Sequence, residues 1–370
     1  MRFIVPSDIL CNGLNIVAKA AATRGIQPVL SNILVEALDS NELRLCATDL
    51  DISIEMKIPA TVSNAGSITL PAKKLMDIVS KLPNKQVCFS LNPDNNITRI
   101  TCELSKFELI GISSGEFPSI SYPDADEAFS IELEPLLKAI KQTVFAAATY
   151  DMNNILSGVF FQVKDTTLEM AATDGNRLAR VLKKINAEKS KDYSAIIPSR
   201  TLTEFLRITS GVSSESVTIA IKNGQISFNI QDRVLTSRLL EGQYPKYQQL
   251  IPNNYEINSE IDRDALISAL DLTATMVNDR TSIIKFVFMD NSLQLSADTP
   301  DLGDSFDQID VKYKGEELKI AFNYKYIIDV LRVMESESVK IELGGPLSSV
   351  LFKNPDDDDS LFLIMPVQIK

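Results

Sequence analysis

The sequence repeats itself about every 125 residues, and this period limits the possible folds more than any other feature of the chain. Ala-Thr-Asp occurs at 47–49 and again at 172–174, and Ala-Asp-Thr occurs at 297–299, so both intervals are 125 residues. A fixed period of this length predicts tandem domains of one fold, not a solenoid of short repeats. With 370 residues, the chain has room for three such domains, each with a core of its own.

Each repeat contains two amphipathic segments with helical spacing, separated by short β-rich runs that end in turn residues. The expected helices cover residues 8–24, 72–82, 134–148, 199–209, 263–280 and 323–334. In the β-rich stretch 215–240, Asn223-Gly224 is the preferred two-residue hairpin turn. Few strands lie within one short loop of a helix on both sides, which favours antiparallel sheets over a doubly wound parallel sheet. The sequence therefore predicts an α+β chain of six modules of about 62 residues, with one helix in each.

The composition argues against an enzyme. The chain has no histidine, so the usual general base near neutral pH and the commonest metal ligand are both missing. Cys11, Cys46, Cys88 and Cys102 show no CxxC spacing, which favours reduced thiols over a zinc site or disulfides. The first ten residues lack the apolar segment of a signal peptide, and the longest apolar run, 361–367, is too short to span a bilayer. We therefore expect a soluble, cytoplasmic protein.

Basic residues are concentrated in the expected helices. The chain has a net charge of −12, but the six helical segments contain 13 basic and 8 acidic residues, a total of +5, which leaves −17 for the rest. Helices with this bias would attract phosphates without reading bases, while the acidic remainder would repel nucleic acid. Lysines extend from amphipathic helices in many proteins, so one helix would decide nothing. The same bias in five of six helices favours a surface that faces nucleic acid.

Motifs along the whole chain match one family. They are MRFIV at the start, LSNILVE at 30–36, ATDLDISIE at 47–55, PAKKLMDIV at 71–79, FPSI at 117–120, AATDGNRLA at 171–179, EGQYPKY at 241–247 and IMPVQIK at the end. In this order they resemble the β subunits of bacterial DNA polymerase III, the DNA sliding clamps.

The resemblance implies three clamp domains at 1–122, 123–252 and 253–370, each of two βαβββ-type modules with antiparallel sheets outside and two helices inside. It also implies a head-to-tail homodimer that closes into a ring around double-stranded DNA of any sequence and tethers the replicative polymerase. A bacterial, cytoplasmic processivity factor of this kind has no catalytic residue, metal or cofactor of its own. The implied partners are the α subunit of DNA polymerase III, the δ subunit of the clamp loader, other polymerases and mismatch-repair proteins.

The resemblance also carries contact residues over by position. The family's DNA contacts fall on Arg24, Lys73, Lys74, Arg200, Arg207 and Arg280. Its dimer contacts fall on Lys74, Lys106, Phe107, Leu109, Ala274, Thr275, Met276, Asp298, Asp301 and Asp304, with Arg99 and Asp307 close by. Asn153 and Asn154 stand where relatives often have arginine and tyrosine, which argues against a DNA contact from that loop.

A peptide-binding cleft is the third site that the resemblance implies. It falls on Leu156, Thr173, Gly175, Asn176, Arg177, Leu178, Pro245, Gln249, Leu250, Leu347, Ser349, Leu363, Ile364, Met365, Pro366 and Val367. An apolar pocket with a few polar edges suits the Leu or Phe anchor of a short linear motif. Gly175 would permit the turn and Arg177 would donate at the rim. Asn176 replaces a histidine common in the family and Gln249 a frequent arginine, so the preferred motif stays open.

Other interpretations remain at this point. Asp49 and Asp174 could be the carboxylate pair of a hydrolase that acts on a polymer, or the chain could be a monomeric scaffold that does not bind DNA. We expect Asp174 to serve a turn, and Asp49 and Asp298 to serve the equivalent strand ends. The acidic run 355–360 lacks the spacing of a calcium loop, so a solvated hairpin tip is expected there.

Overall fold

The computed structural model describes residues 1–23, 27–123, 128–149, 154–188, 192–252, 255, 257–278, 281–300, 303–355 and 357–368. The chain forms two compact units. The first contains Met1–Leu133, Ala187–Ser190 and Arg200–Leu239, and the second contains Glu134–Asn186, Lys191–Ser199 and Leu240–Lys370.

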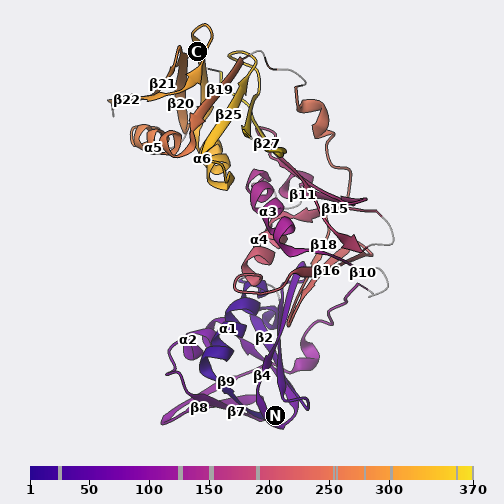
Figure 1. Cartoon of the computed structure of the whole chain (residues 1–370). Coiled ribbons are helices and arrows are strands. Elements are labelled where there is room, and N and C mark those ends of the chain that lie inside the picture. The colour runs from indigo at the N-terminus through magenta and orange to yellow at the C-terminus, as the bar shows by residue number, and fades with distance from the viewer. Residues whose placement is uncertain are drawn as a thin grey trace. The chain divides into compact units, whose positions relative to one another are not determined.

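Six βαβββ modules follow one another along the described residues (Figure 1). The first two modules are β1 (Arg2–Pro6), α1 (Ser7–Val17), β2 (Asn32–Leu38), β3 (Glu42–Thr48) and β4 (Ile52–Pro59), then β6 (Gly66–Pro71), α2 (Ala72–Val79), β7 (Gln86–Asn92), β8 (Ile97–Cys102) and β9 (Ser105–Ile110). The third and fourth are β10 (Ala128–Glu132), α3 (Leu133–Thr143), β11 (Gly158–Lys164), β12 (Thr167–Thr173) and β13 (Arg177–Lys184), then β15 (Tyr193–Pro198), α4 (Ser199–Ile208), β16 (Ser216–Lys222), β17 (Gln225–Ile230) and β18 (Arg233–Arg238). The last two are β19 (Ile257–Asp262), α5 (Arg263–Ala274), β20 (Ile283–Met289), β21 (Ser292–Thr299) and β22 (Gly303–Asp310), then β24 (Leu318–Asn323), α6 (Tyr324–Val333), β25 (Ser338–Leu343), β26 (Val350–Asn354) and β27 (Asp357–Ile364). A short strand follows the first, third and fifth modules: β5 (Thr61–Asn64), β14 (Ala187–Glu188) and β23 (Lys312–Tyr313). The predicted modular α+β fold is confirmed.

The first unit contains two antiparallel sheets. One has the order β5-β1-β7-β8-β9, and β9 is its end strand. The other has the order β14-β10-β16-β17-β18-β4-β3-β2-β6, in which β18 pairs with β4. The last strand of one module therefore continues the sheet of another. The predicted Asn223-Gly224 turn joins β16 to β17, with φ of 52° and 71°.

The second unit repeats this arrangement. Its larger sheet has the order β15-β11-β12-β13-β27-β26-β25-β19-β23, and its smaller sheet has the order β22-β21-β20-β24. Here β13 pairs with β27, again two last strands, while β22 is an end strand. Most of the acidic run predicted as a solvated hairpin tip belongs to β27 instead, since that strand begins at Asp357; there Lys183 forms ion pairs with Asp357 and Asp359 at 3.5 and 3.8 Å, and Ser360 is buried.

The helices begin near the predicted positions, but several end early. The first ends at Val17, where 8–24 was expected, and a short 3₁₀ turn, Ala18–Ala20, follows it. A 3₁₀ turn, Val144–Ala146, likewise follows α3. Alanine favours helix, yet Ala21 and Ala147 are extended. Tertiary structure therefore overrides local propensity at these two ends.

The core lies between the helices and the sheets. Leu10, Leu14 and Val17 of α1 are buried, as are Leu266 and Leu270 of α5. In Figure 1, α1 and α2 lie side by side in the first unit, as do α5 and α6 in the second. None of the helices in the described ranges has the length and apolar character needed to cross a membrane.

Candidate functional site

The turn between β12 and β13 is held by its own Thr and Asp. The Thr173 hydroxyl donates to the carbonyl of Arg177 at 2.6 Å and accepts from the Gly175 amide at 3.1 Å. Asp174 Oδ1 accepts from the amides of Asn176 and Arg177 at 2.9 and 3.1 Å. Gly175 has a φ of 92°, which favours glycine. The carboxylate of Asp174 therefore has the expected role in the turn.

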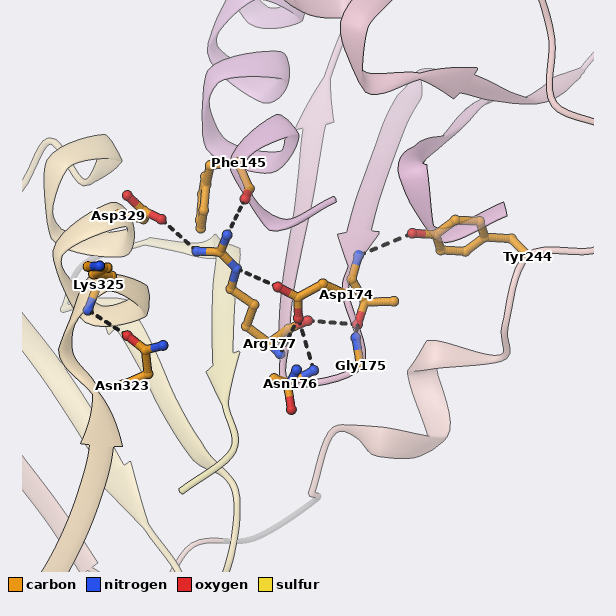
Figure 2. Close-up of polar contacts among 10 residues, drawn as sticks. Phe145, Asp174, Gly175, Asn176, Arg177, Tyr244, Asn323, Lys325 and Asp329 are labelled. Carbon is orange, nitrogen blue, oxygen red and sulfur yellow. Dashed lines mark hydrogen bonds and ion pairs between the residues drawn. The ribbon is translucent and has the colours of Figure 1, made fainter. Parts of the chain in front are cut away.

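Arg177 is anchored inside the second unit (Figure 2). Its Nε lies 3.0 Å from Asp174 Oδ2, its Nη1 lies 2.7 Å from Asp329 Oδ2, and its Nη2 donates to the Phe145 carbonyl at 2.6 Å. Its guanidinium carbon lies 4.5 Å from the centre of the Tyr326 ring and 5.3 Å from that of Phe145. The side chain is only 10% exposed. Each of the three nitrogens therefore already has a partner within the unit, which leaves only the second N–H of Nη1 and of Nη2 for the expected role as a rim donor.

An apolar row crosses three strands next to this turn. Leu178 of β13 is opposite Leu363 of β27, which is opposite Leu351 of β26. These leucines form one buried cluster with Ala171, Leu361 and Tyr247, and Phe160, Tyr244, Ile251 and Tyr255 pack against it partly buried. The pairing brings two of the predicted cleft residues, Leu178 and Leu363, into direct register.

Two tyrosines fix the segment that covers this row. The Tyr244 hydroxyl accepts from the Thr173 amide at 3.1 Å (Figure 2), and the Tyr247 hydroxyl donates to Glu169 at 2.7 Å. Glu169 also pairs with Arg180 at 2.8 Å. Burial raises the pKa of both tyrosines, so each stays protonated at neutral pH. The predicted cleft residues did not include either tyrosine, although both lie in the motif EGQYPKY and Tyr247 follows Tyr122 by one repeat of 125 residues.

The other predicted cleft residues differ in exposure. The Met365 amide donates to the Asn176 carbonyl at 2.8 Å, so the chain after β27 lies against the turn. Leu250, Leu347 and Met365 are 57, 61 and 42% exposed. Ile364 is buried, Pro245, Gln249, Gly175 and Asn176 are exposed, and Leu156, Ser349, Pro366 and Val367 are intermediate. Large exposed apolar side chains of this kind are typical of a surface that binds another protein.

The first unit has a matching turn. Asp49 Oδ1 accepts from the amides of Asp51 and Ile52 at 3.2 and 3.0 Å, and Asp49 Oδ2 lies 2.5 Å from Arg200. The expected turn role of Asp49 is therefore confirmed, with an added ion pair. Leu50, with a φ of 81°, holds the place of Gly175.

The third repeat departs from the expected alignment. Asp298 lies within β21 opposite Asp304, and the turn closes at Thr299 opposite Gly303. Thr299 thus takes the place of Thr173, and Pro300 that of Asp174. The expected turn role of Asp298 is wrong, because this turn is one residue shorter.

The predicted DNA contacts differ in exposure and in whether an acidic side chain pairs with them. Lys73 and Lys74 are exposed on α2. Arg200 pairs with Asp49, and Arg207 lies 2.5 Å from Glu204. Arg24 and Arg280 lie outside the described residues.

Four of the predicted dimer contacts lie on two end strands, β9 and β22. Lys106 and Phe107 are exposed on β9, Leu109 is partly buried there, and Asp304 is exposed on β22. Lys74 is exposed on α2, Ala274, Thr275 and Met276 lie at the end of α5, and Asp298 is exposed on β21. Asp301 lies outside the described residues. Leu104, which directly precedes β9, Ile110 of β9 and Phe306 of β22 are 97, 74 and 61% exposed.

Three family descriptions cover almost the whole chain. Residues 1–121 match the N-terminal domain of the DNA polymerase III beta subunit, residues 130–246 match its central domain, and residues 248–368 match its C-terminal domain. The chain belongs to this family, the sliding clamps. It is therefore a processivity factor without catalytic activity of its own. The hydrolase interpretation is excluded.

Sliding clamps from other organisms align with this chain over its full length. The beta sliding clamp of Synechocystis sp. is 33% identical, and the alignment covers 100% of both chains. The crystal structure of the DNA polymerase sliding clamp from Bacillus subtilis has a TM-score of 0.93 at 30% identity and full coverage of both chains. That of a sliding clamp from Pseudomonas aeruginosa bound to griselimycin has a TM-score of 0.93 at 29% identity, also with full coverage. The fold prediction of three tandem clamp domains is confirmed.

Proposed function

We propose that two copies of this chain join head to tail into a ring around duplex DNA and that an apolar cleft on the ring docks the replicative polymerase and other partners. One observation carries this proposal. Within the chain, last strands of modules pair in two places, β18 with β4 and β13 with β27. The remaining two last strands, β9 and β22, are the end strands of their sheets.

A third junction of the same kind would join β9 of one copy to β22 of the next. An open strand edge presents unpaired backbone groups that favour such pairing. The two surfaces differ, so the contact would be heterologous, and in the proposed ring two copies close it.

The existing junctions also give a register for the proposed one. Arg233, the first residue of β18, is opposite Met56, and Thr236 is opposite Ser53. Transferred to the equivalent positions, this register puts Lys106 opposite Ser305 of the other copy, diagonal to Asp307. Opposite charges at a diagonal position attract each other. Phe107 would then lie diagonal to the exposed Phe306.

The exposed bases of the helices support the DNA-facing role. Lys19, Lys73, Lys74, Lys141, Arg207, Lys325 and Arg332 are all exposed on the helices or the turns that end them. Phosphate contacts of this kind hold DNA without reading its sequence, so a ring could slide. Because Arg200 pairs with Asp49, we expect it to contribute less than Lys73 or Lys74.

The apolar row and the exposed side chains of Leu250, Leu347 and Met365, here called the rim, support the docking role. We infer that short hydrophobic linear motifs dock there, and that their carriers include the α subunit of the polymerase, the δ subunit of the clamp loader, other polymerases and mismatch-repair proteins. The buried row would hold a Leu or Phe anchor, and the rim leucines would cover it. We place this activity in the bacterial cytoplasm. The three domains would divide at 122/123 and 252/253.

Retention on DNA tests the ring. Labelled protein is loaded onto nicked circular plasmid with a bacterial clamp loader and ATP, the salt is raised, and the circle is then cut. We expect retention at high salt and loss after linearisation, because salt screens charge contacts but does not open a ring. Release from the intact circle by salt, after verified loading, would contradict the ring.

A disulfide tests the register. In a background with Cys11 and Cys88 replaced by Ser, Lys106→Cys with Ser305→Cys should give a covalent dimer on oxidation, since opposed residues of paired strands come within disulfide reach. Lys106→Cys with Phe306→Cys is the matched control, because neighbouring strand residues point to opposite faces. Equal yields from both pairs would contradict this register.

A further inference from the structure

Helices α4 and α6 carry the same arrangement of charges, one repeat of 125 residues apart. In both, an acidic residue has one base four residues before it and another three residues after it. Side chains at these spacings are neighbours on the surface of a helix, so the acid can pair with either base. The residues are Arg200, Glu204 and Arg207 in α4, and Lys325, Asp329 and Arg332 in α6.

In α4 both bases already have a carboxylate partner. Glu204 Oε1 lies 2.5 Å from Arg207 Nη1, within the same helix. Arg200 Nη1 lies 2.5 Å from Asp49 Oδ2, in the turn after β3. A phosphate that approached α4 would have to compete with these two carboxylates for the bases.

In α6 the acidic residue pairs with an arginine from outside the helix. Asp329 Oδ2 lies 2.7 Å from Nη1 of Arg177, the first residue of β13 (Figure 2). The ring of Tyr326, also on α6, lies 4.5 Å from the guanidinium carbon. Lys325 and Arg332 are exposed, and neither forms an ion pair within the part of the chain that the structure describes. Both bases of α6 therefore keep their ammonium or guanidinium group free.

The difference between the helices follows one position in the neighbouring turns. Ile52 holds in the first unit the place that Arg177 holds in the second, since the two are one repeat of 125 residues apart. An isoleucine cannot form an ion pair with a carboxylate. In the unit with the isoleucine the acid of the helix pairs within its own helix, and in the unit with the arginine it pairs with the turn.

We propose that Arg177 is a positioning residue for DNA: it holds the carboxylate of Asp329 away from Lys325 and Arg332, which leaves both bases of α6 free to contact phosphates. This proposal rests on the DNA-facing role proposed for the helices. A residue of the turn beside the apolar row thereby sets the charge that α6 presents to DNA.

The salt dependence of DNA binding by the full chain tests this. Fluorescence anisotropy of a short labelled duplex gives the association constant at several salt concentrations, and the slope of log K against log salt measures the number of phosphates contacted. Arg177→Met should reduce the slope by about 1, because the released carboxylate of Asp329 then pairs with Lys325 or Arg332. Arg177→Met with Asp329→Asn should restore the slope of the wild type. A purely structural role of Arg177 would not give this rescue.

A matched pair of single substitutions keeps the test independent of how well Arg177→Met folds. Glu204→Gln should increase the slope by about 1, because it releases Arg207 for a phosphate. Asp329→Asn should leave the slope unchanged, because this carboxylate holds no base of its own helix. Circular dichroism verifies that both variants are folded.

Three results would overturn the proposal: an unchanged slope in folded Arg177→Met, a reduced slope that Asp329→Asn does not restore, or equal increases in Glu204→Gln and Asp329→Asn. Lys73→Ala with Lys74→Ala separates these from a failure of the DNA-facing role, because it removes two exposed bases of α2 and should reduce the slope by about 2. An unchanged slope in that variant would contradict the DNA-facing role itself.

Discussion

The two nine-stranded sheets present the same row of positions with opposite chemistry. Thr173, Leu178, Leu363 and Leu351 are successive neighbours across the second unit, and Thr48, Ser53, Thr236 and Ser227 are their counterparts in the first. The backbone register is the same in both. The difference shows that a repeated fold does not repeat a binding site, because the side chains at the crossing strands decide which group is held.

The tyrosine that anchors each covering segment repeats as well, with its ion pair reversed. In the first unit, Tyr122 donates to Glu55, which pairs with Arg44 at 2.8 Å. In the second, Tyr247 donates to Glu169, which pairs with Arg180. Arg44 and Glu169 occupy equivalent positions, as do Glu55 and Arg180, since each is 125 residues from its counterpart. The pair keeps its structural role when its charges change places.

The two turns should differ most when their arginines are removed. Arg177→Met leaves Asp174 and Asp329 without their buried partner, and we expect the free energy of unfolding to fall by about 3–5 kcal/mol. Arg200→Met removes the partner of Asp49 from a site where the arginine is 38% exposed, and should cost less than about 1 kcal/mol. Urea denaturation followed by circular dichroism measures both. Equal losses would show that the two turns are stabilised alike.

Conversion of the apolar row into the hydroxyl row should remove apolar binding. Leu178→Ser with Leu363→Thr should weaken binding of a peptide that ends in Leu-Phe at least about tenfold, because the apolar anchor would then lie against hydroxyl groups instead of the two leucines. Isothermal titration calorimetry measures the affinity, and circular dichroism verifies that the variant is folded. Thr236→Val is the control and should not change this affinity. Unchanged affinity in the double variant would place the apolar site elsewhere.

Exchanging glycine and leucine at the position with positive φ should destabilise the turn at Gly175 and change the stability of the turn at Leu50 less. Gly175→Leu introduces a side chain at φ 92°, where its Cβ would meet no heavy atom within 4 Å, so only backbone strain of about 1–2 kcal/mol is expected. Leu50→Gly relieves the same strain, but glycine adds freedom to the unfolded chain, so the change should stay within about 1 kcal/mol. Thermal unfolding compares the two. A larger loss in Leu50→Gly than in Gly175→Leu would contradict this interpretation.

The smallest expected effect is the pH dependence of the stability that Glu342 contributes at the end of the apolar row. Glu342 is opposite Leu351, where the first unit has Ala220 opposite Ser227. Burial raises the pKa of Glu342, but hydrogen bonds and charge from Lys340 and Lys353 outweigh it, and the pKa lies below its ordinary value. The resulting stabilisation is present above the unfolded-state pKa of about 4.3 and is lost as the pH falls through the lower folded-state pKa.

Glu342→Gln should therefore lower the free energy of unfolding by less than about 1 kcal/mol at pH 7 and by less still near pH 3. Urea titrations at the two pH values measure the difference. A loss of unfolding free energy that grows as the pH falls would contradict a lowered pKa of Glu342.

Part of the candidate site could be predicted from residue positions alone. The Thr-Asp turn, the positive φ at Gly175 and the proximity of the C-terminal strand agree with the family motifs. The partners of Arg177 could not be predicted, because Asp329 and Phe145 are distant in sequence and only packing brings them to the guanidinium. Leu351 reaches the row through the pairing of β26 with β27, and Tyr247 reaches it through the packing of the segment after β18, so neither contact could be predicted from a linear motif.

The sequence alone determined the repeat of 125 residues, the six modules and the concentration of basic residues in helices, because periodicity and turn chemistry are local properties. Only the tertiary structure decided which module continues which sheet, and which side chains meet across β13, β27 and β26 or across β4, β18 and β17. Opposed side chains of these rows lie between 9 residues (227 and 236) and 185 residues (178 and 363) apart, and their contact depends on backbone register. That register places leucines together in one sheet and hydroxyls together in the other.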